Sequence, residues 1–148
     1  MDDPALRTTR PRRRTVEQHV DDAVHAFLGP SWVVLLAARA TRAGRKEFRR
    51  RLTGMVELRP GCESIAVDGM SEHDILALLL SRGAPERCVL VKDGLLEDEI
   101  TDLPSALHRA LQSQEGALVS CLAGRLCFLQ CDGGRTRAIL TPTLTSSA

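Results

Sequence analysis

Trp32-Val-Val-Leu-Leu-Ala-Ala38 is a run of seven residues without a charge or a backbone breaker, and it decides the fold. A strand with one face in water alternates polar and apolar residues, and this run does not alternate. The pattern predicts a strand buried on both faces, inside a sheet covered by helices. A buried helix is the alternative, which Pro30 and the shortness of the run disfavour.

Helix and strand patterns continue on both sides of this run. Three helices are expected to begin at the N-cap residues Thr15, Ser71 and Asp102 and to end at Gly29, Gly83 and Gly116. Before the last of them, strands are expected over residues 55–58, 64–67 and 88–91. Three more are expected over residues 117–122, 125–131 and 135–140, joined by tight turns, which predicts an antiparallel meander.

The order of these elements predicts a single α/β domain, with α+β as the alternative class. We expect a mixed sheet packed with three or four helices and a C-terminal antiparallel β-meander. A chain of 148 residues suits one such domain. The domain is expected over residues 15–140, between a disordered basic arm (1–14) and a flexible tail (141–148).

The composition is that of an ordinary globular chain, 43% hydrophobic and 26% charged. Aromatic residues make up 3%, with no Tyr, so few side chains are available for stacking on nucleic-acid bases. No apolar run approaches the ~18 residues of a membrane span. The charged N-terminus lacks the apolar segment of a signal peptide, so an intracellular location, cytoplasmic or nuclear, is expected.

Charge is divided unevenly along the chain. Residues 1–53 carry a balance of +6 and residues 54–148 a balance of −5. Most of the excess lies in residues 39–51, which read as a helix from about residue 41, although Gly44 leaves a loop possible. In a helix, five of its cationic side chains fall within an arc of roughly 140°. These are Arg42, Arg45, Lys46, Arg49 and Arg50.

This basic segment is the main candidate binding site. The candidate residues are Arg42, Arg45, Lys46, Arg49, Arg50 and Arg51, with Arg12, Arg13 and Arg14 of the arm. The first hypothesis is a non-catalytic adaptor or regulatory protein that binds an acidic protein partner through this face. The alternative is nucleic-acid binding by the arm and the segment 39–51. A solvated face without a partner is equally compatible with the pattern.

The acidic loop Glu97-Asp98-Glu99, which continues to Asp102, has a spacing that matches no calcium loop. It is interpreted as a solvated loop, or as the electrostatic complement of the basic segment. The five cysteines include no Cys-x-x-Cys pair, and strand geometry keeps Cys121 and Cys127 on opposite faces. No metal or other cofactor is therefore expected.

An enzyme is the third hypothesis. The sequence has no phosphate-binding glycine loop, no nucleophile elbow and no paired metal-binding histidines. Catalytic residues can still assemble from distant positions, so a dispersed site near Cys62, His73 or the acidic loop stays open. A cleft that joins these residues would favour it.

Overall fold

The computed structural model describes the backbone of residues 4–142 and the side chains of residues 15–142. A six-stranded sheet forms the centre, with strand order β1-β6-β5-β4-β2-β3. The strands are β1 (Glu63–Ala66), β2 (Arg87–Lys92), β3 (Glu99–Asp102), β4 (Ala117–Leu122), β5 (Leu126–Cys131) and β6 (Thr136–Thr141). The helices are α1 (Pro4–Phe27), α2 (Pro30–Ala38), α3 (Arg42–Arg51), α4 (Glu72–Ser81) and α5 (Leu103–Leu111).

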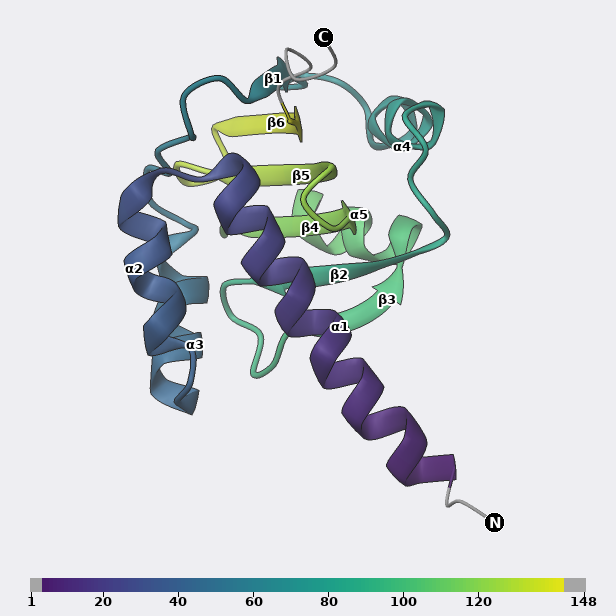
Figure 1. Cartoon of the computed structure of the whole chain (residues 1–148). Helices are drawn as coiled ribbons and strands as arrows, with labels where there is room; N and C mark the ends of the chain where they lie inside the picture. Colours follow the sequence, from purple (N-terminus) through teal and green to yellow (C-terminus); the bar gives the residue numbers. More distant parts are fainter. Residues whose placement is uncertain (1–3, 143–148) are drawn as a thin grey trace, which may run out of the picture.

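Helices cover both faces of the sheet, and each face has its own core (Figure 1). In the view of Figure 1, α1 crosses in front of the sheet, α2 and α3 stand beside it, and α5 lies behind. Successive residues of a strand serve the two cores in turn, as Leu118 and Val119 do on β4. This is why the central strands contain unbroken apolar runs, at residues 88–91 of β2 and 126–129 of β5. The chain is thus a single domain of helices and sheet, as predicted.

The prediction of a central strand at residues 32–38 was wrong, because this run is helix α2. Pro30 occupies its first turn, where a proline costs nothing because the first N–H groups of a helix have no partner within it. Gly29 precedes it as the N-cap residue. Trp32 is buried, but Val34 on the other side of the helix is 74% exposed. The longest uninterrupted apolar run in the chain therefore lies at the surface of the domain.

Because residues 32–38 form a helix, the sheet differs from the one that was predicted. Every neighbouring pair of strands is antiparallel, where a mixed sheet was expected. The predicted strand 55–58 is reduced to an isolated bridge between Leu28 and Leu58. The acidic loop contributes the edge strand β3 instead.

The long helix α1 begins at Pro4, upstream of the predicted start at Thr15. The side chains of Arg12, Arg13 and Arg14 lie outside the described residues, as does the tail from residue 143 onward.

The C-terminal meander and the predicted N-caps at Ser71 and Asp102 are confirmed, whereas Thr15 lies inside α1 and the last predicted helix ends at Leu111, well before Gly116. Strands β4, β5 and β6 pair in sequence order, with Ser120 opposite Cys127. A bulge after Ser120 brings Leu122 opposite Leu126, and Cys121 and Cys127 still serve opposite cores. These local patterns predict structure well because turns and caps depend on few residues.

Replacing Ser71 by Ala is expected to lower the free energy of unfolding by about 1 kcal/mol. The Ser71 hydroxyl accepts a hydrogen bond from the Asp74 backbone N–H at 3.1 Å, at the start of α4. Urea denaturation measures the change. Ser71→Asn, which keeps a capping oxygen, is the control and should lose a few tenths of a kcal/mol at most. Equal losses in the two variants would contradict the capping role.

Candidate functional site

Two arginines of the predicted basic segment point into the protein. Arg39, which follows α2, is 3% exposed, and Arg49 of α3 is 2% exposed. Both donate to the carboxylate of Asp98, over 2.6 Å from Arg39 Nη2 and 2.9 Å from Arg49 Nη1. Arg39 Nη2 also donates to Glu17 of α1 at 3.0 Å. We call Arg39, Arg49 and Asp98 the Asp98 cluster.

The Asp98 cluster is packed against aromatic rings. The Arg39 guanidinium carbon lies 4.8 Å from the centroid of the Phe48 ring, within the range of a cation–π contact. Phe48 meets Trp32 edge to face, with centroids 5.1 Å apart. Arg49 also donates to the Leu96 carbonyl at 3.0 Å. These contacts attach the loop before β3 to the corner between α2 and α3.

Charge is not fully matched within the Asp98 cluster. Two buried guanidinium groups share one buried carboxylate, and Glu17 is half-exposed. Arg39 Nε and Nη1 and Arg49 Nε are buried with no hydrogen-bond partner among the described residues. Burying an ion pair costs desolvation energy, which the attraction between the charges offsets only when the geometry is good. The cluster is therefore sensitive to the loss of the carboxylate or of a guanidinium group.

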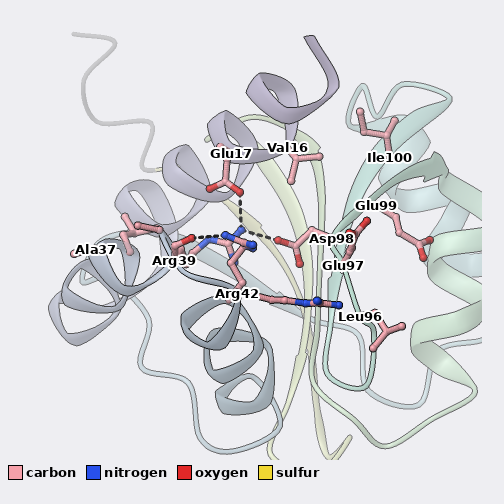
Figure 2. A pocket seen from close by; sticks show the side chains of 13 residues that line it. Val16, Glu17, Ala37, Arg39, Arg42, Leu96, Glu97, Asp98, Glu99 and Ile100 are labelled. Carbon is pink, nitrogen blue, oxygen red and sulfur yellow. Dashed lines mark hydrogen bonds and ion pairs between the residues drawn. The ribbon is translucent and has the colours of Figure 1, made fainter. Parts of the chain in front are cut away.

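An open pocket of about 1120 Å³ lies beside this cluster, between α1, the α2–α3 corner and the loop before β3. Figure 2 shows Glu17 and Asp98 pointing toward Arg39 from different elements. The pocket is also lined by Arg42, Arg45, Glu97 and Glu99. Arg39 is engaged by Glu17 and Asp98, and Glu99 is engaged by Arg109 at 2.6 Å. The contacts across this pocket thus mainly join the α2–α3 corner to the rest of the domain.

The outer side of α3 is basic and exposed. We call Arg42, Lys46, Arg50 and Arg51 the basic face, and all four are exposed. Glu47 accepts from Arg50 Nη2 at 2.7 Å and from Arg51 Nε at 2.9 Å. Hydrogen bonds from Arg50 and Arg51 lower the pKa of Glu47 to about 2. One carboxylate thus offsets part of the charge of four cations.

The structure divides the predicted site residues into three groups. Arg42, Lys46, Arg50 and Arg51 lie at the surface as expected, and Arg45 is half-buried with its guanidinium on the Arg39 carbonyl. Arg49 was placed on the exposed arc, and this is corrected, because it is buried. It follows Phe48 and precedes Leu52 by three positions, so it turns inward with them. The expectation that the acidic loop complements the basic segment is met at Asp98.

A second surface feature, which the sequence analysis missed, lies next to the basic face. It is an open hollow of about 690 Å³ between α2, the end of α3 and the turn that follows, and we call it the α2 groove. Its lining residues are Ser31, Trp32, Val34, Leu35, Arg50, Arg51, Gly54 and Met55. Met55 is 80% exposed. The groove was missed because α2 was expected inside the sheet.

The dispersed catalytic site is not assembled. Cys62 packs with the core under α1, and burial raises the pKa of its thiol. His73 is exposed on α4, which packs against the opposite face of the sheet. The pocket beside the acidic loop includes neither residue.

A serine and a histidine do meet elsewhere. His19 Nδ1 lies 2.6 Å from Ser120 Oγ, and burial lowers the pKa of His19. A serine nucleophile must reach its substrate, and Ser120 is fully buried on β4 under α1. The contact is better explained as satisfying two polar groups inside the core.

The described part of the chain contains neither a candidate membrane-spanning helix nor a candidate metal site. None of its helices combines the length and the apolar character needed to cross a bilayer. No three His, Cys, Asp or Glu side chains among residues 15–142 are grouped so that they could hold a metal ion.

Comparisons of the chain with protein-family models, with curated proteins and with solved structures found no match.

Proposed function

We propose that this protein is a non-catalytic interaction module that binds an acidic protein partner through the basic face of α3. The observation that carries the proposal is the exposure of Arg42, Lys46, Arg50 and Arg51 on one short helix. Arg49 is held inside by Asp98, which anchors α3 and fixes the direction in which its outer side points. A rigid array of cations gives both attraction and orientation to an acidic segment.

Nucleic acid is the competing partner for such a surface. Single-stranded nucleic acid is commonly bound by stacking bases on aromatic side chains. The aromatic residues of this chain are one Trp and three Phe, and all of them are buried. Binding to nucleic acid would therefore lack aromatic stacking, which supports the protein partner as the first candidate.

The test is a selection of displayed random peptides of about 16 residues, long enough for four helical turns, on the immobilised full chain. Selected peptides are expected to carry net negative charge. The triple variant Arg42→Gln, Lys46→Gln, Arg50→Gln is expected to bind them about tenfold more weakly, because three exposed ion pairs of about 0.5 kcal/mol each are lost. Fluorescence anisotropy of the selected peptides measures the affinities.

The matched control removes the same amount of charge elsewhere. Arg82, Arg125 and Arg135 are exposed and lie off α3, so their triple Gln variant should keep wild-type affinity. Equal losses in the two triple variants would reduce the effect to net charge and contradict the proposal. Selected peptides without an acidic excess would also contradict it. A duplex DNA of about 20 base pairs that binds more tightly than every selected peptide, with affinity falling steeply as salt rises, would favour nucleic acid instead.

A further inference from the structure

We propose that the α2 groove takes the apolar side chains of the same acidic partner, so that the partner segment is an amphipathic helix. This inference rests on the proposed function and adds the binding mode. The groove and the basic face are continuous, since Arg50 and Arg51 belong to both. A segment that pairs its carboxylates with these arginines brings its neighbouring side chains over Val34 and Met55.

The apolar character of α2 is the first argument. A helix that is hydrophobic all round is normally buried on all sides. Apart from Ser31, every residue of α2 is apolar, and Trp32 faces the core. Val34 on its outer side is 74% exposed, and Met55 across the groove is 80% exposed. Two large apolar side chains that flank one hollow are typical of a binding surface rather than of scattered exposure.

Charge complementarity decides the occupant. The rim of the groove carries Arg50 and Arg51, and no acidic side chain lines it. Glu47 pairs with both arginines, and the negative charge of Asp93 also acts on Arg50. With Lys46 and Arg42 on the same helix, the rim stays positive. A second copy of this chain, docked by a two-fold axis through the groove, would bring these cations against themselves, which disfavours self-association.

The walls of the groove favour a helix as the bound form. The lining residues come from α2, α3 and the turn after α3, and no strand edge is among them. An extended segment could not add to the sheet here, so its backbone groups would be left unpaired on the apolar surface. A helix satisfies its own backbone and presents apolar side chains at positions i, i+3 or i+4, and i+7.

The same peptide selection tests this inference with different variants. Peptides selected on the wild-type chain are expected to combine acidic residues with apolar residues at helical spacing. Val34→Asp and Met55→Asp, which change exposed residues of the groove, are each expected to weaken binding of these peptides at least tenfold. Leu80→Asp replaces a half-exposed leucine on α4 and is the control, expected to keep wild-type affinity. Circular dichroism checks that all three variants keep the wild-type helix content.

The outcomes separate this inference from the proposed function. One outcome would overturn the role of the groove and leave the proposed function standing. In it, the selected peptides are acidic but lack apolar residues at helical spacing. Their binding is weakened by the basic-face triple variant and unchanged by Val34→Asp. Peptides without acidic excess would overturn both. Two other occupants, a second copy of the chain and a lipid surface, are tested by comparing the wild-type chain with Val34→Asp. The first would give a concentration-dependent dimer that Val34→Asp abolishes. The second would give binding to phosphatidylcholine–phosphatidylserine vesicles that Val34→Asp abolishes. Either result in place of peptide binding would overturn the inference.

Discussion

Replacing Asp98 by Asn is expected to lower the free energy of unfolding by about 3–5 kcal/mol, the range for breaking a buried ion pair by removal of one partner. The substitution keeps the size of the side chain but removes the one buried negative charge between Arg39 and Arg49. Glu17 cannot compensate, because its side chain is half-exposed and contacts Arg39 alone in the cluster. The one amide oxygen of Asn could accept from one arginine but carries no charge, so Arg49 would be a buried cation with neutral acceptors alone, such as the Leu96 carbonyl.

Urea denaturation of the wild-type chain and of Asp98→Asn measures this loss of unfolding free energy. Glu97→Gln is the control, because Glu97 is the exposed neighbour of Asp98, and a change within about 0.5 kcal/mol is expected there. Replacing Arg39 and Arg49 by Met together with Asp98→Leu should recover much of the stability, since apolar groups of similar volume remove the desolvation cost. A loss below about 1 kcal/mol for Asp98→Asn would mean that the carboxylate is not needed to hold the arginines.

Much of the fold could be predicted from local patterns. The meander depends on three short strand segments joined by short glycine turns, and these signals lie within a few residues of the structure that they specify. Ser71 and Asp102 each accept a hydrogen bond from a backbone N–H three residues later, as their capping positions predict.

The two largest errors have a common physical cause. A short run of apolar residues suits a buried strand and a helix equally well, and the choice at residues 32–38 is made by tertiary packing. Pro30 is compatible with both, because it fits the first turn of a helix. Tertiary contacts also decide strand β3, whose sequence Glu99-Ile-Thr-Asp102 has little apolar content and which is defined by its pairing with β2.

The candidate site could be predicted only in outline. Helical geometry placed the arginines of residues 42–51 on one arc, but it could not say which edge of the arc faces the core. Phe48 and Leu52 carried that information, because the side that they occupy also holds Arg49. The buried partner was among the predicted complements of the basic segment, in the acidic loop. The α2 groove could not be predicted, since its existence depends on where α2 lies.

Replacing Phe48 by Ala is expected to cost about 3–5 kcal/mol of unfolding free energy, the usual loss for removing a buried phenyl ring. Phe48 is fully buried on α3 and joins Trp32 of α2 to the Arg39 guanidinium. The cavity left by the ring removes packing from both neighbours. Because α2 forms one wall of the groove, the effect should reach the surface that we propose binds the partner.

Trp32 is the only tryptophan of the chain, so its fluorescence reports on α2. In folded Phe48→Ala its emission should shift to the red as water reaches the indole. Phe128→Ala is the matched control, because Phe128 is equally buried but belongs to the core on the other face of the sheet. It should lose a similar stability and leave the emission of the folded protein unchanged. Equal red shifts in the two variants would show a general loosening of the domain and contradict a specific role of Phe48 in seating α2.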